Sequence, residues 1–297
     1  MGRHTMAEPA DGLSGAGPRT GGTARAGARP APVRAPAARS DGAIASARGL
    51  TKIYGAGDTQ VRALDAVDVD LARGELTAIM GPSGSGKSTL MHCMAGLDSP
   101  TSGSVVVDGV EISRMSQRQL TKLRRTRIGF VFQAYNLVPT LTAAENITLP
   151  LDIARRPLDR HRFDAVVRAV GLEDRLHHRP SELSGGQQQR VACARALIAE
   201  PSVVFADEPT GNLDSRAAAE VLGFLRHSVD DLGHSVVIVT HEASAAAYAH
   251  RVLFLADGRL EAELVDPDAG SILDALGELG AARERRLAPA APSGHPA

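Results

Sequence analysis

Short aliphatic runs recur through the middle of the chain, and turn residues or longer mixed stretches separate them. Runs of about four to eight apolar or β-branched residues bounded by turn residues are typical of buried strands. The predicted strands are Leu50–Tyr54, Val67–Leu71, Leu76–Met80, Ser104–Val107, Ile128–Phe132, Val203–Asp207, Val236–Thr240 and Val252–Leu255. The core that they build must be aliphatic, because the chain has only six Phe and three Tyr.

Between these runs, apolar residues fall at helical spacing with polar residues on the opposite face. The predicted helices are Lys87–Leu97, Ser116–Arg125, Arg160–Val170, Gly185–Glu200 and Arg216–Leu232. From Thr142 to Arg195 the pattern is mostly helical. It predicts a helical subdomain, at about residues 140–200, inserted into a sheet.

The order of the predicted elements indicates the fold class. The buried strands Val203–Asp207 and Val236–Thr240 are separated by a helix, as in a parallel α/β sheet. Two Asp-Gly pairs, Asp108-Gly109 and Asp257-Gly258, lie between apolar runs and predict hairpin turns. The chain is therefore predicted to be an α/β protein that also contains antiparallel strands.

The two ends of the chain differ in composition from its middle. Residues 1–46 hold 12 Ala, 8 Gly and 5 Pro, with six Arg against three acidic residues. So few large apolar side chains cannot offset the entropy cost of ordering, which predicts a disordered basic tail. A weak attraction of this tail to an anionic membrane surface is the alternative. The folded domain is predicted at residues 47–265, and residues 266–297 as a flexible tail that allows a short helix at Ile272–Leu279.

Composition and charge argue against several classes of protein. The formal net charge is -1, so no chain-wide basic field favours binding to nucleic acid. Apolar runs such as Val236–Val239 fall far short of the roughly 18 to 20 residues that a spanning helix needs, so any membrane role requires a partner. Cys93 and Cys193 lie in apolar helical runs and are expected to pack in the core. With no secretory signal pattern, the expected compartment is the cytosol.

A glycine-rich loop lies between a predicted strand and a predicted helix. Residues 81–88 read GPSGSGKS, which matches G-x-x-x-x-G-K-[ST]. Glycines in this context let successive backbone N–H groups point inward, and the following helix presents its positive N-terminus. Lys87 would reach the β and γ phosphates, and Ser88 would offer its hydroxyl to Mg²⁺. The loop therefore predicts a nucleotide phosphate site.

The lysine in this loop stands out against the basic residues of the chain. Of 33 Lys and Arg residues, only Lys52, Lys87 and Lys122 are lysines. A guanidinium is a broad planar fork, whereas an ammonium is a compact point charge that fits among backbone amides around a phosphate. The lysine at position 87 is therefore consistent with a site that needs a point charge.

Further motifs follow the loop in a fixed order. They are Gln133 after Ile128–Phe132, LSGGQQQ at residues 183–189, VVFADE at residues 203–208, Leu213-Asp214, and His241 after Val236–Thr240. With Tyr54 upstream, this series resembles the ATP-binding subunit of an ABC transporter over about residues 47–260, some 70% of the chain. The resemblance implies a P-loop NTPase core of the ABC ATPase type, an antiparallel β subdomain, an inserted helical subdomain, and ATP and Mg²⁺ as cofactors.

The resemblance also implies a role for individual residues. Asp207 would hold Mg²⁺ opposite Ser88, and Glu208 would be the general base that polarises the attacking water. Gln133 would contact Mg²⁺ and that water, and His241 would bind the γ-phosphate. The full set is Lys87, Glu208 and His241 for catalysis, Ser88, Gln133 and Asp207 for metal, and, for nucleotide, Tyr54, Gly81, Pro82, Ser83, Gly84, Ser85, Gly86, Lys87, Ser88, Thr89, Gln133, Ser184, Gly185, Gly186, Gln187 and Asp214.

Two members of this set are ambiguous when taken alone. A glutamine after a strand, such as Gln133, is typical of a solvated loop, and a tyrosine at a strand end, such as Tyr54, is typical of ordinary packing. The resemblance favours a nucleotide-sensing role for the glutamine and stacking on adenine for the tyrosine.

A second anion site is predicted away from the first. Ser184 precedes the helix that starts at Gly185, and serine is a favoured N-cap. Its hydroxyl and the amides of Gly185 and Gly186 would bind an anion at the helix N-terminus. One nucleotide needs only one phosphate-binding loop from its own chain, which residues 81–88 already supply. The resemblance implies that two subunits pair head to tail, so that Ser184 of one closes on the γ-phosphate bound to the other, with Asp214 at the boundary.

Two longer stretches resemble one subgroup of this family. Residues 132–142, FQAYNLVPTLT, and 208–215, EPTGNLDS, look most like subunits that serve lipoprotein-releasing and macrolide- or peptide-exporting permeases. This resemblance implies a homodimer of ATPase subunits and a separate membrane permease with few helices and a large extracytoplasmic domain. The expected location is cytoplasmic, peripheral on the inner face of the plasma membrane through that permease.

Two alternatives come from the same resemblance. One is a cell-division ATPase of the same subgroup, which drives cell-wall hydrolases without moving a solute. The other is a soluble DNA-repair, chromosome-organising or ribosome-acting ABC ATPase. Gln133 and Ser184 are only 51 positions apart without sustained heptads between them, and the sequence has one cassette, so this second alternative is disfavoured. No nucleic-acid partner is expected.

Overall fold

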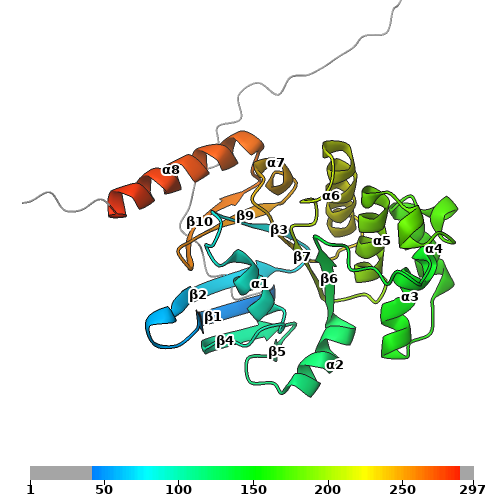
Figure 1. Cartoon of the computed structure of the whole chain (residues 1–297), viewed down its shortest axis with the longest axis horizontal. Coiled ribbons are helices and arrows are strands. Elements are labelled where there is room, and N and C mark those ends of the chain that lie inside the picture. The colour runs from blue at the N-terminus through cyan, green and yellow to red at the C-terminus, as the bar shows by residue number, and fades with distance from the viewer. Residues whose placement is uncertain (1–41, 288–297) are drawn as a thin grey trace, which may run out of the picture. The chain divides into compact units, whose positions relative to one another are not determined.

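Two sheets form the framework of the computed structural model, which describes residues 42–287 (Figure 1). The first sheet is antiparallel, in the order β2-β1-β4-β5, and consists of β1 Ala43–Tyr54, β2 Val61–Ala72, β4 Ser102–Val107 and β5 Val110–Glu111. The second has the order β10-β9-β3-β8-β7-β6 and consists of β3 Leu76–Met80, β6 Ile128–Phe132, β7 Val203–Asp207, β8 Val236–Val239, β9 Arg251–Ala256 and β10 Arg259–Val265. Its strands are parallel except β10, which pairs antiparallel to β9.

Helices cover the second sheet and form a group beside it (Figure 1). They are α1 Lys87–Met94, α2 Gln117–Arg127, α3 Ala143–Ala154, α4 Arg160–Ala169, α5 Gly185–Leu197, α6 Ser215–Asp230, α7 Ala243–Ala246 and α8 Ala269–Leu287. The helices α3, α4 and α5 lie between β6 and β7 in the chain and group together, with α5 against both α3 and β6. Within the described residues, no helix is long and apolar enough to cross a membrane.

The predicted fold class is confirmed: a parallel core sheet, an antiparallel sheet and inserted helices are all present. The strands β3, β6 and β7 have the predicted bounds, because each is a short, mostly apolar and mostly buried run. The strand β1 is 12 residues long, and the predicted Leu50–Tyr54 is only its second half. Bulges between Ala47 and Leu50 break the alternation there, and the first half is built largely of alanine.

Helix α3 was not predicted as a separate element. Pro150 lies inside it, which disfavours a helix in sequence terms. Its N-terminus nevertheless carries a capping box, in which the Thr142 side chain accepts from the Glu145 N–H and Glu145 accepts from the Thr142 N–H. This S/T-x-x-E pattern is the signal that would have located the helix.

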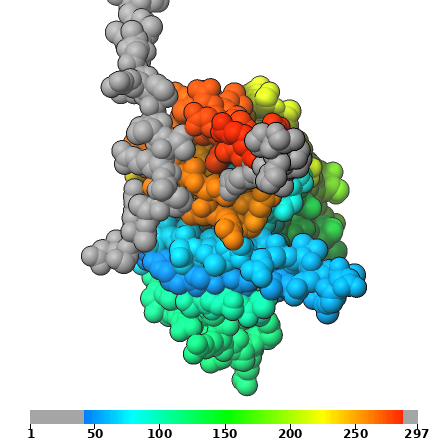
Figure 2. Space-filling model, turned by 90° about the vertical axis from the view of Figure 1, so that its left-hand side faces the viewer, coloured from blue at the N-terminus to red at the C-terminus, as the bar shows by residue number. Residues whose placement is uncertain are grey.

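Ordered structure extends beyond residues 47–265 at both ends. The strand β1 begins at Ala43, and α8 covers 19 residues where the sequence allowed a short helix at Ile272–Leu279. Ile272 and Ala275 of α8 are fully buried, and Figure 2 shows α8 over the β9 and β10 region. Packing of this apolar stripe stabilises a helix that its three glycines disfavour. The rest of the two predicted tails, residues 1–41 and 288–297, lies outside the described residues.

The core consists of two hydrophobic clusters on opposite faces of the second sheet. Alternate residues of β7 join them: Phe205 belongs to the cluster under the antiparallel sheet, and Val204 to the cluster under the helices. Cys93 lies in the first and Cys193 in the second, which confirms their predicted packing. Burial raises the pKa of each thiol to about 12.

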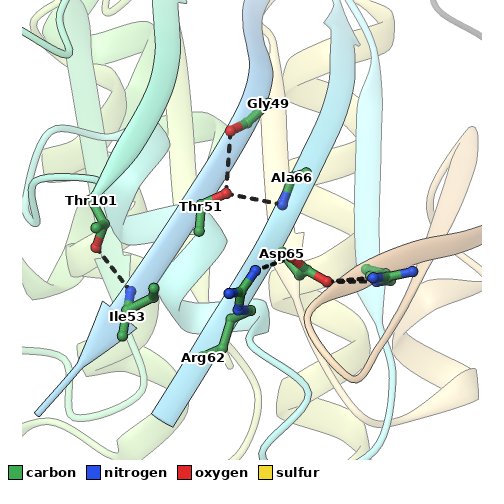
Figure 3. A network of polar contacts seen from close by, with 8 residues as sticks. Gly49, Thr51, Ile53, Arg62, Asp65, Ala66 and Thr101 are labelled. Atoms are coloured by element: carbon green, nitrogen blue, oxygen red, sulfur yellow. Dashed lines mark hydrogen bonds and ion pairs between the residues drawn. The ribbon is translucent and has the colours of Figure 1, made fainter. Parts of the chain in front are cut away.

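A polar network fixes the antiparallel sheet to the β9–β10 turn (Figure 3). Asp65 in β2 accepts from Arg62 Nη1 at 2.6 Å and from Arg259 Nε at 2.8 Å, and both hydrogen bonds lower the pKa of the Asp65 carboxyl. The Asp65 N–H also donates to Gly258 O at 2.9 Å. The Gly258 N–H in turn donates to Ser85 O at 3.0 Å. The antiparallel sheet is thereby connected to the glycine-rich loop.

Candidate active site

The glycine-rich loop joins β3 to α1 and allows no side chain at two of its glycines. A Cβ on Gly81, whose φ is +150°, would lie 1.9 Å from Leu255 O. A Cβ on Gly86, whose φ is +101° at the N-cap of α1, would lie 2.3 Å from Ala63 O. The loop is thus held tightly between β9 and β2, with the N-terminus of α1 directly behind it.

Gly81→Ala is expected to destabilise the fold by about 2 to 4 kcal/mol, because the new Cβ meets a backbone carbonyl and the φ is strained for alanine. Gly223→Ala is the matched control. Gly223 lies inside α6 with nothing within 4 Å of its Cβ position, so alanine should stabilise the protein by about 0.5 to 1 kcal/mol. Denaturant unfolding measures both, and equal effects would contradict this description of the loop.

Lys87 is buried and points back along the loop. Its side chain is only 9% exposed, and Nζ donates to Gly81 O at 3.0 Å and to Pro82 O at 2.9 Å. Burial lowers the pKa of Lys87, while the charges of Glu208 and Asp207 raise it. An ammonium held by neutral carbonyls at a helix N-terminus suits an anionic ligand, which would supply the missing negative charge.

Ser85 adds an independent indication of a polar ligand site in this loop. Its Oγ is buried and has no hydrogen-bond partner among the described residues. Buried hydroxyls are normally paired, so an unpaired one inside this loop fits a polar ligand there.

Ser88 and Asp207 meet at the carboxyl edge of the second sheet. The Ser88 Oγ donates to Asp207 Oδ1 at 3.1 Å. Asp207 ends β7 and pairs with the last residues of its neighbours, Phe132 of β6 and Val239 of β8. A hydroxyl beside a carboxylate is the oxygen donor set that Mg²⁺ takes. His92, which the sequence analysis did not single out, lies one helical turn after Ser88, with its Nε2 3.6 Å from Asp207 Oδ2.

Glu208 and His241 form an ion pair next to this edge. Glu208 has a φ of +48°, rare for a non-glycine residue, and its N–H donates to Val239 O at 2.9 Å. His241 Nδ1 lies 2.9 Å from Glu208 Oε1, and that hydrogen bond raises the pKa of His241. The His241 side chain is 64% exposed, so a ligand can approach its ring.

His241 is expected to titrate above its ordinary pKa of about 6.5. The ion pair stabilises the fold fully below that ordinary value, and this contribution is lost as the pH rises through the raised pKa. Glu208→Gln should return the titration toward about 6.5, measured by NMR on the imidazole protons. His234, whose pKa is lowered mainly by burial, should be unaffected; an unchanged His241 midpoint would contradict the pairing.

Gln133 follows Phe132, which pairs with Asp207 at the sheet edge, and its side chain bonds the segment after Glu208. Its side-chain amide donates to Asn212 Oδ1 at 3.4 Å, and Asn212 Nδ2 donates to Gln133 O at 3.0 Å. A Cβ on Gly211 would lie 2.7 Å from Gln133 Nε2, so the amide packs closely on this glycine. Gln133 is therefore directed toward the segment after Glu208. Asn212 is a contact that the sequence analysis missed.

Tyr54 lies at the end of β1 in a cluster of its own. Its hydroxyl donates to Asp98 Oδ2 at 2.7 Å, and Lys52 Nζ lies 4.8 Å from the ring centroid. Burial and the hydrogen bond to Asp98 raise the pKa of Tyr54. Tyr54 is 41% exposed as a residue, which is compatible with a stacking partner on its ring. Lys52 and Asp98 were not predicted to surround it.

Ser184 caps α5, as predicted. Its Oγ accepts from the Gln187 N–H at 3.3 Å, and Gln187 Oε1 accepts from the Ser184 N–H at 2.9 Å. A Cβ on Gly186 would lie 2.8 Å from the Cβ of Ala217, in the first turn of α6. Asp214 caps α6 by accepting from the Ala217 N–H at 2.8 Å. The N-termini of α5 and α6 therefore lie side by side.

A cavity of about 570 Å³ opens beside the glycine-rich loop. Among its lining residues are Lys87, Glu208 and His241, but none of residues 183–187. Its far wall comes from α8 and contains Leu276, Leu279, Gly280 and Arg283. Arg283 Nη2 lies 2.7 Å from Asp257 Oδ1 of the β9–β10 turn. The apolar spacing of α8 was the only sequence signal for this wall, and it did not reveal what the helix packs against.

Comparison with known proteins agrees with this geometry. The family described as ABC transporter matches residues 64–211. An uncharacterized ABC transporter ATP-binding protein of Thermotoga maritima is 48% identical over 212 residues, which cover 71% of this chain and 90% of that protein. The macrolide export ATP-binding/permease protein MacB of Bdellovibrio bacteriovorus is 45% identical over 216 residues, 73% of this chain. The chain spans only 33% of that MacB protein.

A solved structure is similar over most of the described residues. The ATP-binding cassette MJ0796 of Methanocaldococcus jannaschii, a dimer in a post-hydrolysis state with bound ADP and Pi, superposes with a TM-score of 0.69 at 40% identity. The match covers 75% of this chain and 99% of the other. On the strength of these identities, the chain belongs to the ABC transporter ATP-binding proteins, the ATPase subunits of these transporters.

Proposed function

We propose that this chain hydrolyses Mg²⁺-ATP with Glu208 as the general base, and that hydrolysis drives a separate membrane permease. The observation that carries the proposal is the Glu208–His241 pair, 2.9 Å between Oε1 and Nδ1, on the wall of the cavity that Lys87 also lines. A carboxylate at that place can accept a proton from water, and the imidazole orients the carboxylate and faces the reacting phosphate.

Lys87 and the loop amides would bind the phosphates. The ammonium now donates to two carbonyls of its own loop, at 3.0 and 2.9 Å. Charge-assisted bonds to phosphate oxygens are stronger than bonds to neutral carbonyls, so ATP would draw Nζ away from Gly81 and Pro82. Binding energy is then concentrated at the terminal phosphates, where negative charge develops during the reaction.

Ser88 and Asp207 would hold Mg²⁺, because they offer a hydroxyl and a carboxylate 3.1 Å apart. When bound, the metal would supply positive charge that offsets the negative charge of the phosphates. Gln133 is proposed to join this site only after its contact with Asn212 breaks, because its amide is at present committed there. Tyr54 is proposed to stack on adenine through the exposed part of its ring.

Two copies of the chain are proposed to pair head to tail. Residues 183–187 do not line the cavity beside the glycine-rich loop of their own chain. The anion site at Ser184 would therefore not contact a nucleotide bound at that loop. Pairing would place Ser184 of one copy on the γ-phosphate held by the other, with Asp214 beside it. The dimeric state reported for MJ0796 supports the pairing of two copies.

The permease partner is proposed from the subgroup that the relatives suggest. MacB is by name an ATP-binding and permease protein in one chain, and this chain spans about a third of it. The Thermotoga relative, 90% of which is matched, is little more than the cassette. We therefore propose a separate permease with few helices and a large extracytoplasmic domain, with the ATPase at the cytoplasmic face of the membrane.

Co-expression with a few-helix permease encoded beside this gene tests the partnership. The two proteins should copurify in detergent, and the permease should change the rate of phosphate release from ATP. A chain that hydrolyses ATP but neither copurifies nor responds would overturn the proposed partner and leave the ATPase intact.

A further inference from the structure

Gln189 of α5 contacts the backbone beside two catalytic candidates at once. Its side chain is 0% exposed, and its Nε2 donates to Phe132 O at 3.3 Å and to Pro209 O at 2.6 Å. Phe132 directly precedes Gln133, and Pro209 directly follows Glu208. One buried amide therefore links both segments to the helix that begins after Ser184.

The same side chain carries an unpaired atom. Gln189 Oε1 is buried and has no hydrogen-bond partner within residues 42–287. An unsatisfied buried oxygen costs stability, and an apolar side chain of similar length would avoid that cost. Glutamine at this position donates hydrogen bonds to Phe132 O and Pro209 O, and methionine could not donate either.

Arg195, further along α5, holds the loop after β6. Its Nη1 donates to Asn136 O at 2.7 Å and its Nη2 to Tyr135 O at 2.8 Å. Tyr135 and Asn136 have φ values of +59° and +49°, a left-handed pair in consecutive non-glycine residues. Such conformations persist only where the surroundings impose them. Arg195 is the side chain that bonds both carbonyls, and burial lowers its pKa.

This loop also touches the start of α5 and the segment after Glu208. The Tyr135 hydroxyl donates to Asn212 O at 3.5 Å. A Cβ on Gly185 would lie 2.9 Å from the same hydroxyl, so the tyrosine packs on the first turn of α5. With the Gln133–Asn212 contacts, the loop is fixed at both ends of α5 and at the segment that leaves Glu208.

We propose that Gln189 and Arg195 are positioning residues for ATP hydrolysis. They bond α5, which begins after Ser184, to the backbone segments that contain Gln133 and Glu208. A shift of α5 would therefore move Gln133 and Glu208 together. The inference rests on the proposed role of Glu208. In the described residues the side chains of Gln189 and Arg195 bond the backbone of residues 132, 135, 136 and 209 and not residues 81–88, so we expect them to affect the rate of hydrolysis more than the affinity for ATP.

The test replaces each residue by methionine, with a matched control from the same helix. Gln188 donates to Leu183 O at 3.0 Å, within its own helix start, and Arg190 donates to Val170 O at 3.0 Å, at the end of α4. Gln189→Met and Arg195→Met should lower kcat about tenfold or more, while the Kd for ATP changes by no more than about twofold. Gln188→Met and Arg190→Met should stay within about twofold of the parent chain in both quantities.

The proposal is overturned if kcat is unchanged, if the Kd for ATP rises as much as kcat falls, or if the controls lose as much activity. Thermal unfolding of every variant is measured first. If a methionine variant does not fold, Gln189→Asn and Arg195→Lys take its place. Asparagine keeps the amide on a shorter side chain, and lysine keeps one donor nitrogen. Both variants are expected to lower kcat and to leave the Kd for ATP nearly unchanged. A parent chain without ATPase activity would instead refute the proposed function itself.

Discussion

Glu208→Gln is expected to bind ATP and to hydrolyse it at least about 100 times more slowly than the parent chain, because general-base catalysis contributes roughly 10² to 10⁴ in rate. Glutamine keeps the size of the side chain and can still face His241, but it cannot accept a proton from water. The proposed dimer closes on the γ-phosphate and opens when the γ-phosphate is lost. The variant should therefore also accumulate as a dimer when ATP is added. Phosphate release and size-exclusion chromatography with ATP measure the two effects.

Glu242→Gln is the matched control, because Glu242 is the exposed carboxylate next to His241 in sequence. It should leave turnover within about twofold of the parent chain. Unchanged turnover in Glu208→Gln would remove Glu208 as the base. Equal loss in both variants would show that net charge near His241 matters and the position of the carboxylate does not.

Lys87→Ala should lose ATP affinity by about 10- to 100-fold, since hydrogen bonds to charged groups contribute about 1.5 to 3 kcal/mol. The free protein should not be destabilised, because the substitution removes a charge that burial disfavours. The distinctive result is therefore thermal: the same concentration of ATP raises the Tm of the variant much less than that of the parent chain.

Lys87→Arg sharpens this experiment. It keeps the positive charge but replaces the compact ammonium by a wide planar guanidinium. We therefore expect Lys87→Arg also to bind ATP weakly. Lys122→Ala, on the exposed face of α2, is the control and should bind ATP as the parent chain does. Normal ATP stabilisation in Lys87→Arg would show that charge alone is required, and normal stabilisation in Lys87→Ala would contradict the phosphate site.

The parts of the site that the sequence predicted are those built by contiguous residues. Residues 81–88 form the loop because glycines, a preceding buried strand and a following helix occur together, and no distant contact is needed to recognise them. Asp207 ends the buried strand β7 and Glu208 follows it, so their place at the sheet edge was predictable. Ser184 was recognisable as an N-cap from its own helix.

Other parts of the site depend on contacts between segments far apart in the chain. Gln133 was expected at the metal, but Asn212, 79 positions away, binds its side chain in the structure. The long helix α8 could not be located over the phosphate loop from its own pattern, because that pattern gives an apolar face and no partner. Gln189 and Arg195 looked like ordinary helix residues until their carbonyl partners were visible.

Hydrolysis of Mg²⁺-ATP by the purified full chain, measured as phosphate release over a range of protein concentrations, tests the central claim most directly. A composite site between two copies predicts a specific rate that rises with protein concentration, requires Mg²⁺ and is lost in Lys87→Ala. A specific rate independent of concentration, or one that survives Lys87→Ala, would contradict the account.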